Sequence, residues 1–480
     1  MKRTICMILL CALLASLTAC GEASTPVDTT SPTTTDTQPA GEEGAFAYRE
    51  KLEIEFPDKN YEGREFRVLA QDAYERDIYV ESETGEVLND TIYARNQWLT
   101  EQYNVKITAV FEACDKIPNT ITNSVLAGED AYDMISNHAI FSGSLAIQNV
   151  LMNMFDVETI DFSYPWWSES ILDSFSYKNT ALLAPAELCL SVSEATQCLF
   201  FNADKAADYQ ITGLYDEVRG GTWTIDKLIS YTKDVYVDLD GSTTADDTDF
   251  YGLGSKGGHA MFYWYAFGEK FVEITDEGIE PVLYNEKVVS FFDKILSYYN
   301  EPGVHWFKGS GSAVPQFADG NRLFAIGGFD DVEKYLRDME SEFGILPLPK
   351  LDEAQEAYHT MAGGAHSVIG IPKTVSDPEF VGLMIENLNY YSYKYVTPTY
   401  CNTALKSKYA RDDDSMEMID LILSSVVFDF GYLLDNWKGF AFIPQNMVES
   451  GSSDLASNYA SRITSAQEWW NSVVEAFEND

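Results

Sequence analysis

The sequence predicts an α/β fold, because strand-like and helix-like segments alternate in the first part of the chain. Phe66–Ala70 is a short apolar run typical of a buried strand, and a helical pattern follows over 90–103. Val105–Phe111 then has the alternation of a strand, and a helical pattern at Ile117–Ala127 leads into the strand Tyr132–Ile135. Strands joined through helices in this way connect by right-handed crossovers, so we expect a mostly parallel sheet.

The composition is that of a folded, strongly acidic protein. Of its 480 residues, 45% are apolar and 22% are charged, which excludes disorder, collagen and coiled coil for the bulk of the chain. A net charge of −44 argues against nucleic acid as a partner, because nucleic-acid binders need a basic face. Aromatic residues reach 14%, and surplus aromatic side chains often line binding clefts. The length suits about three domains or one large two-lobed protein.

The N-terminus has the features of an export signal. Lys2 and Arg3 precede an apolar run, Ile5–Leu17, that is shorter than a membrane-spanning helix. The following Leu17-Thr18-Ala19-Cys20 resembles the lipobox of bacterial lipoproteins, in which the cysteine is acylated (for example with palmitate) and becomes the first residue. The alternative is an ordinary signal peptide with an accidental cysteine. We therefore expect residues 1–19 to be removed and Cys20 to anchor the protein to the outer face of the cell membrane.

The residues after Cys20 predict a solvated tether. Gly21–Gly44 is rich in Ser, Thr and Pro and has no Lys or Arg, so it has little to bury. We expect the anchor and a disordered tether to occupy residues 20–63.

Four cysteines remain beyond the signal and anchor: Cys114, Cys189, Cys198 and Cys401. None forms a CxxC pair, so neither a zinc ribbon nor a thioredoxin-type redox motif is indicated. Cys189 and Cys198 lie in two apolar runs that suggest a hairpin, where they would be either a disulfide or buried free thiols.

Several stretches carry a family resemblance in their order and spacing. They are Gly128–Ile135, Gly221–Leu228, Phe317–Phe324, Phe343–Pro349, and Gly363-Gly364 before Val368–Pro372. Together they resemble family 1 extracellular solute-binding proteins, the sugar-type lipoproteins of ABC importers, over residues 64–480. The resemblance implies a two-lobed periplasmic-binding-protein-like (type II) fold, a hinge of chain crossings, and a ligand cleft between the lobes. Ligands of open α/β sheets bind at the carboxyl ends of the strands, which agrees with such a cleft.

The predicted lobe boundaries follow from interruptions in the pattern. Pro165 and the double tryptophan after it mark a change of module, and the prolines of Phe343–Pro349 indicate an extended crossing segment. We expect lobe 1 at 64–157 and 343–371, and lobe 2 at 158–342 and 372–480. A capping box at Ser376–Glu379 predicts a helix over Phe380–Tyr391.

Catalytic motifs are not evident in the sequence. There is no Gly-x-Ser-x-Gly, His-Glu-x-x-His or Walker loop, and the glycine pattern Gly252–Gly257 does not follow a clear strand. We expect a binding protein rather than an enzyme. A lipid-anchored glycoside hydrolase stays open as the alternative, because 76 acids make a chance carboxylate pair inevitable.

One acidic loop has the spacing of a calcium site. Oxygen-bearing side chains stand at positions 1, 3, 5, 9 and 12 of an EF-hand-like loop. Thr243 replaces the usual glycine, the last ligand is Asp rather than Glu, and a solvated acidic loop is the alternative. The candidate ligands are Asp238, Asp240, Ser242, Asp246 and Asp249.

A sugar site needs flat aromatic surface and hydrogen-bonding groups around it. Asp72, Asn137 and His138 follow predicted strands, where the resemblance places ligand contacts. For each aromatic candidate the alternative is core packing. The second-lobe candidates are Trp166, Trp167, Tyr263, Trp264, Phe329, Asp330 and Trp437.

The sequence and the resemblance together predict reversible capture of a carbohydrate, an oligosaccharide, and its delivery to the permease subunits of an ABC transporter. Closure of the hinge around the ligand would be the mechanism. We expect a monomer that needs no cofactor, with calcium as a structural ion at the acidic loop.

Overall fold

A computed structural model of the chain describes residues 46–167, 169–309, 311–407, 413–435 and 439–479. The predictions for the signal peptide, Cys20, the first part of the tether and Trp437 lie outside these residues. Within them, no helix combines the length and the apolar character needed to cross a membrane.

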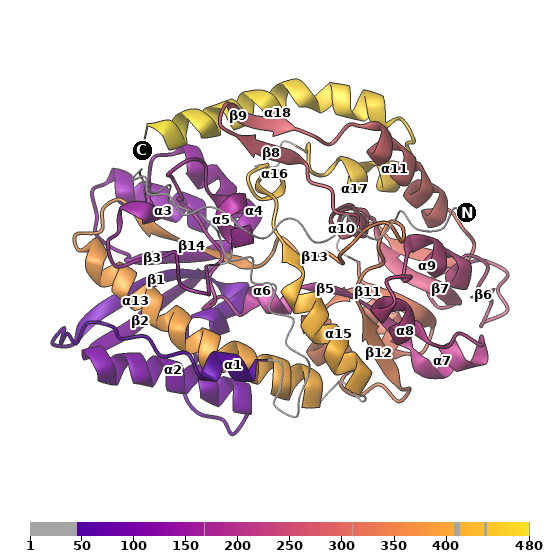
Figure 1. Cartoon of the computed structure of the whole chain (residues 1–480), viewed down its shortest axis with the longest axis horizontal. Coiled ribbons are helices and arrows are strands. Elements are labelled where there is room, and N and C mark those ends of the chain that lie inside the picture. Colours follow the sequence, from indigo (N-terminus) through magenta and orange to yellow (C-terminus); the bar gives the residue numbers. More distant parts are fainter. Residues whose placement is uncertain (1–45, 168, 310, 408–412, 436–438, 480) are drawn as a thin grey trace, which may run out of the picture. The chain divides into compact units, whose positions relative to one another are not determined.

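The first sheet has five strands in the order β2-β1-β3-β14-β4 (Figure 1). β1 pairs in parallel with both β2 and β3, which confirms the predicted parallel α/β arrangement. β14 joins antiparallel to β3 and β4. The strands are β1 (Arg64–Gln71), β2 (Val105–Glu112), β3 (Met134–His138), β4 (Leu151–Met152) and β14 (Ser367–Pro372).

The helix predicted at Phe380–Tyr391 forms, but in the first lobe, so its assignment to lobe 2 is wrong. Tyr103 at the end of α2 donates a hydrogen bond of 3.1 Å to Asn387 on this helix. Its cap is Asp377, whose carboxylate accepts from the Phe380 amide at 3.2 Å, in place of the Ser376 cap of the predicted capping box. The longer helices of this lobe are α2 (Val87–Tyr103), α3 (Ile117–Leu126), α5 (Glu169–Phe175) and α13 (Pro378–Tyr391).

The segment 158–190 also belongs to the first lobe, which corrects the predicted boundary at Glu158. The Asp161 amide donates to Glu386 on α13 at 2.9 Å, and Ala184 forms an isolated bridge with Ile369 of β14. The short elements of this lobe are α4 (Ala139–Ser142), the 3-10 helices η1 (Asp72–Asp77), η2 (Gly143–Ile147) and η3 (Met154–Asp156), and the π-helical turn η6 (Ser392–Val396).

The second sheet has the order β10-β7-β11-β5-β12, with β6 paired to β7. β12 pairs antiparallel with β5. The prediction that Phe343–Pro349 belongs to lobe 1 is therefore wrong, because these apolar residues complete the edge of the second sheet. The strands are β5 (Gln197–Asn202), β6 (Tyr236–Val237), β7 (Phe250–Lys256), β10 (Val304–Phe307), β11 (Arg322–Gly328) and β12 (Phe343–Leu346).

Helices and two small sheets complete the second lobe and the connections. The C-terminal helix α18 packs on β9 of the second lobe, and it also reaches the first lobe, where Thr180 donates to the Phe477 carbonyl at 2.8 Å. The helices are α7 (Ala203–Asp208), α8 (Leu214–Arg219), α9 (Ile225–Thr232), α10 (Ala260–Ala266), α11 (Glu286–Tyr299), α12 (Val314–Ala318), α14 (Thr397–Thr399), α15 (Asp413–Ser424), α16 (Phe430–Leu433), α17 (Ile443–Ser450) and α18 (Leu455–Glu478). The remaining elements are the hairpin β8 (Val272–Thr275) and β9 (Gly278–Pro281), the pair β13 (Thr360–Met361) and β15 (Val426–Val427), α6 (Ser191–Glu194), the 3-10 turn η4 (Gly257–His259), and the π-helical turns η5 (Val332–Leu336) and η7 (Tyr400–Ser407).

The chain from Phe46 to Tyr61, called here the N-terminal strap, is folded onto the first lobe. It begins with α1 (Ala47–Glu50), and Arg49 pairs with Glu187 at 2.7 Å while its guanidinium lies 4.1 Å from the centre of the Tyr393 ring. The predicted tether boundary at residue 63 is therefore wrong, because apolar and charged partners on the first lobe hold this segment.

Cys189 and Cys198 are buried and carry no disulfide to each other. They are thus the buried free thiols of the second alternative, whereas the predicted hairpin between their two runs is wrong. Cys198 lies in β5, which pairs with β11 and β12 rather than with the run before it.

Candidate functional site

The ends of three strands of the first sheet meet at one edge. β1 ends at Gln71, β3 ends at His138, and the antiparallel β14 begins at Ser367, which lies opposite His138. The Gln71 side chain donates to the Ser367 hydroxyl at 2.8 Å and to the Ala365 carbonyl at 3.2 Å. This edge corresponds to the carboxyl ends of the parallel strands, where α/β sheets place their ligands.

The segment 191–196, which crosses to the second lobe, forms hydrogen bonds with this edge. Asp77 accepts hydrogen bonds from the Ser191 amide at 2.8 Å and from the Ser191 hydroxyl at 2.6 Å. The Ser367 amide in turn donates to the Ser191 hydroxyl at 3.0 Å. All three residues are buried, so η1, α6 and the start of β14 form one polar network.

An ion-pair cluster joins the first lobe to the second. Arg76 on η1 pairs with the buried Glu194 of α6 and, at 3.2 Å, with Glu333 on η5, just after β11. On the second-lobe side Lys334 pairs with Asp330 at 2.5 Å. The loops after the carboxyl ends of β1 and β11 are thus in direct contact.

Burial sets the charge state of this cluster. It raises the pKa of Glu194 to about 7, although Arg76 opposes the shift. Burial and the neighbouring Asp330 raise the pKa of Asp331 to about 6, while its hydrogen bond from the Gly328 amide acts in the opposite direction. The carboxyl groups of Glu194 and Asp331 therefore change their protonation state near neutral pH.

Four of the predicted ligand-binding residues lie at these strand ends or directly after them. Asp72 is exposed at the start of η1, and Asp330 takes part in the ion-pair cluster. Asn137 is buried, and its amide donates to the Ser142 hydroxyl at 3.1 Å and the Cys114 carbonyl at 3.3 Å. The His138 ring packs edge-on against Phe141, with the ring centres 4.9 Å apart. Their contact with a ligand stays a prediction.

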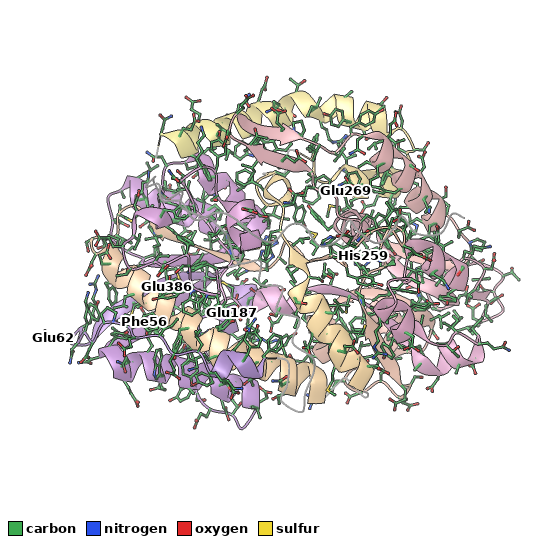
Figure 2. The ribbon with its side chains drawn as sticks, viewed as in Figure 1. Phe56, Glu62, Glu187, His259, Glu269 and Glu386 are labelled. Atoms are coloured by element: carbon green, nitrogen blue, oxygen red, sulfur yellow. The ribbon has the colours of Figure 1, made fainter. Side chains whose placement is uncertain are left out.

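The double tryptophan lies inside the first lobe. The Trp166 and Trp167 indoles donate to Glu386 of α13 at 2.6 and 3.0 Å (Glu386 is labelled in Figure 2). Both side chains are buried. The structure thus gives these two residues a packing partner away from the strand-end loops.

Three more aromatic candidates are buried in the second lobe. Trp264 of α10 lies among Phe271, Phe291 and Phe292, with ring centres 5.1–6.1 Å away. Tyr263 and Phe329 are also fully buried, and Phe329 packs in the core between β5, β11 and β12. Core packing, the alternative named above, is the role that these contacts support.

The structure adds functional candidates that the sequence did not single out. Arg76, Glu194 and Glu333 link the lobes, and His366 lies beside the strand ends at 0% exposure. One signal was available for Arg76, since it is one of only 32 basic residues and stands six residues after a predicted strand end. Nothing local marks the others, because their partners are distant in sequence.

The structure also contains two pockets at other places. One of about 560 Å³ is lined by Arg64, Glu65 and Arg67 with Asp130, Ser376 and Asp377, so it lies at the opposite end of β1 from Gln71. The other, of about 430 Å³, lies where the α5 region, β8 and α16 meet, with Ser174, Lys270, Glu273 and Asp429 in its lining.

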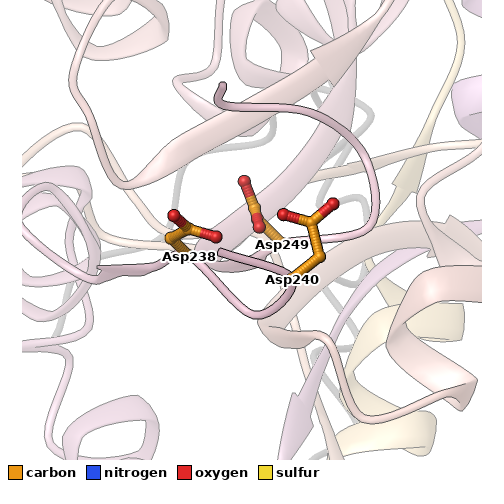
Figure 3. Close-up of side chains that lie close together, drawn as sticks. All are labelled: Asp238, Asp240 and Asp249. Carbon is orange, nitrogen blue, oxygen red and sulfur yellow. The ribbon is translucent and has the colours of Figure 1, made fainter. Parts of the chain in front are cut away.

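Three of the five predicted calcium ligands come together. Carboxylate oxygens of Asp238, Asp240 and Asp249 lie within 4.8 Å of one another (Figure 3). Asp249 is buried and accepts from the Tyr236 hydroxyl at 2.9 Å and the Leu239 amide at 3.0 Å. The other two, Ser242 and Asp246, bond instead to neighbouring loop residues, Thr244 and Thr248.

At the level of sequence, no family model and no curated protein matches the chain. Solved structures do match it. The maltose/maltodextrin-binding domain MalE of Bdellovibrio bacteriovorus, bound to maltotriose, has 13% identity and a TM-score of 0.51 over 86% of this chain and 99% of its own. A cyclo/maltodextrin-binding protein complexed with maltotetraose has 14% identity and a TM-score of 0.54, covering 88% and 98%.

A third match is the ABC substrate-binding protein Lmo0181 of Listeria monocytogenes in complex with cycloalternan, with 13% identity and a TM-score of 0.53 over 85% and 98% of the two chains. The fold is therefore that of the two-lobed, maltose-binding-type solute-binding proteins, as the sequence resemblance predicted.

Proposed function

We propose that this chain is an extracytoplasmic solute-binding protein of an ABC importer, and that it captures an oligosaccharide between its two lobes. The shared fold over 85–88% of the chain carries the proposal, because the three matched proteins are described with bound oligosaccharides. The contact between the loops after β1 and β11 supports it, since these loops mark the place where such a ligand would be enclosed.

The mechanism would be closure of a hinge, without chemistry. The chain crosses between the sheets at 191–196, at 347–366 and after η6, so a few backbone rotations there can move one lobe against the other. A saccharide that contacts both lobes favours the closed state by the difference between its affinities for the two states. Delivery to permease subunits would follow from the closed form.

A calorimetric screen of neutral oligosaccharides, amino acids and peptides tests this function. We expect micromolar or tighter binding of at least one oligosaccharide and no hydrolysis of it on prolonged incubation. Binding of peptides alone would contradict the ligand class, and turnover of a glycoside would favour the alternative hydrolase.

We propose in addition that Cys20 is acylated and holds the protein on the outer face of the cell membrane. The signal-like N-terminus and the lipobox-like residues before Cys20 support this. The variant Cys20→Ala should lose its attachment to the membrane, as measured by fractionation, whereas Cys114→Ala should remain attached.

Calcium at the acidic loop is a separate proposal. The three gathered carboxylates support it, as does Thr243, whose φ of +62° supplies the turn that glycine makes in EF-hand loops. Calcium would stabilise the loop without entering the binding reaction. Addition of calcium after chelation should raise the melting temperature of the wild type but not of Asp240→Asn.

A further inference from the structure

We infer that the candidate site selects saccharides by charge, accepting neutral and amine-bearing oligosaccharides and rejecting those that carry carboxylate or phosphate groups. This inference rests on the proposed function and specifies the ligand class within it. It depends on two observations, the unpartnered hydrogen-bond acceptors at the first-lobe edge and the charges of the loops that face it.

Three acceptor atoms beside the first-lobe edge have no donor within the described part of the chain. Gln71 Oε1, Asn137 Oδ1 and His366 Nε2 are buried without a hydrogen-bond partner among the described residues, and all three residues are at most 1% exposed. The donor groups of Gln71 and Asn137 are already used, as described above.

His366 can be assigned as an acceptor as well. Its Nδ1 lies 2.9 Å from the Gly363 carbonyl, which can only accept, so Nδ1 carries the proton. Burial lowers the pKa of His366 to about 4, which keeps the ring neutral and leaves Nε2 with a lone pair.

A ligand that satisfies these three atoms must bring donors. Sugar hydroxyls and ammonium groups donate hydrogen bonds, whereas carboxylates and phosphates only accept them. An acceptor facing another acceptor in a buried site leaves both unsatisfied, at a cost comparable to a lost hydrogen bond for each. The first lobe therefore disfavours anionic substituents.

The facing loops act in the same direction through charge. Glu194, Asp330, Asp331 and Glu333 surround three cations, of which Arg76 pairs with Glu194 and Glu333, and Lys334 pairs with Asp330. The third, Lys256, faces Asp330 and Asp331. Arg76, Lys334 and Lys256 are thus each already faced by carboxylates, so an incoming anion would have to compete with these carboxylates for every one of the three positive charges.

Tyr400 is the group of this cluster that most directly indicates a ligand. Its hydroxyl is fully buried, has no hydrogen-bond partner among the residues that the structure describes, and lies close enough to Glu194, Asp330 and Arg76 for their charges to act on it. A ligand hydroxyl or amine placed between Tyr400 and these carboxylates would give the phenol a hydrogen-bond partner and would donate to the carboxylates.

The test is calorimetric titration with three saccharides of similar length and different charge. They are chitosan trisaccharide, which carries amines, neutral triacetylchitotriose, and anionic trigalacturonic acid. We expect the first two to bind at least tenfold more tightly than the third at low salt, and the preference for the amine form to shrink as salt rises.

Two variants link the preference to these residues. Asp330→Asn and Glu333→Gln should each reduce the amine-over-anion preference at least threefold, while the exposed control Asp338→Asn leaves it unchanged; Glu333 is half-exposed, so its replacement does not endanger folding. If trigalacturonic acid binds as tightly as the neutral trimer, the inference about charge is overturned and the proposed function is unaffected. Binding of peptides and of no saccharide would overturn the proposed function with it.

Discussion

Glu386 shows how one buried carboxylate organises a whole region of the first lobe. Its two oxygens accept from the indoles of Trp166 and Trp167 and from the Asp161 amide, and it is 0% exposed. Burial raises its pKa to about 7, and these hydrogen bonds oppose the shift. The segment after residue 158 is therefore bound to α13, and the two tryptophans are fixed in place.

Replacing Glu386 by Ala should lower the free energy of unfolding by about 3 kcal/mol, because two buried indole N–H groups lose their acceptor. Urea denaturation followed by tryptophan fluorescence measures the change. Glu101→Ala, at an exposed position of α2, serves as the control and should stay within about 0.5 kcal/mol of the wild type. Equal stability of the two variants would contradict this role of Glu386.

Glu194 gives a prediction for the pH dependence of stability. Burial raises its pKa from 4.5 to about 7, so the folded state holds the proton more tightly than the unfolded chain. Its contribution to stability is then fully present below pH 4.5 and is lost as the pH rises through 7. A shift of this size corresponds to about 3 kcal/mol.

The variant Glu194→Gln stays uncharged and lacks this loss. Its free energy of unfolding should gain about 3 kcal/mol relative to the wild type between pH 4.5 and pH 8, measured by urea denaturation at several pH values. The other titrating groups are present in both proteins, so their effects cancel when the free energy of unfolding of the wild type is subtracted from that of the variant. A difference that does not change with pH would show that Glu194 is not held in the proposed environment.

At the scale of elements, the N-terminal strap connects the tether to a particular lobe. Lys394 of η6 is buried and donates to the Leu52 carbonyl at 2.6 Å, and Phe56 packs on Tyr390 and Tyr164 (Phe56, Glu62 and Glu187 are labelled in Figure 2). If Cys20 is anchored as proposed, the chain from the anchor therefore joins the folded body at the first lobe.

A chain that starts at Glu62 should be about 3 kcal/mol less stable than one that starts at Gly44, since the Arg49 ion pair and the carbonyl partner of buried Lys394 are both lost. Thermal and urea unfolding of the two truncated chains measure this. Identical stability would mean that the strap contributes nothing to the first lobe.

The elements themselves were largely predictable, whereas their partners were not. The strands β1, β2 and β3 follow from local apolar patterns, and α13 from its helical pattern. The sequence did not show that β12 pairs with β5, or that α13 packs on α2, because a local pattern marks a face to be buried and not the surface that buries it.

Across the whole molecule, local sequence patterns likewise predicted single residues of the candidate site but not the contacts between distant residues. The positions of Asp72, Asn137, His138 and Asp330 near strand ends were predictable from local patterns, whereas their contact with a ligand stays a prediction. The ion pair of Arg76 with Glu194 was not predictable, since it joins residues 118 positions apart through the fold. Trp264 shows a second limit, because an aromatic residue suited to a sugar face is equally suited to a core, and the structure packs it against Phe271.

The contact of Arg76 with Glu333 places a protein ion pair between the two lobes, so opening the hinge must break it. A ligand that bridges the lobes adds its own contacts to this pair and shifts the population toward the closed form. Under the proposed function, saccharide binding therefore closes the lobes.

Small-angle X-ray scattering of the purified protein, with and without a saturating oligosaccharide from the calorimetric screen, measures this closure. We expect a smaller radius of gyration with the saccharide, and no change with a non-binding saccharide of the same size. A saccharide that binds and leaves the radius of gyration unchanged would contradict closure of the lobes.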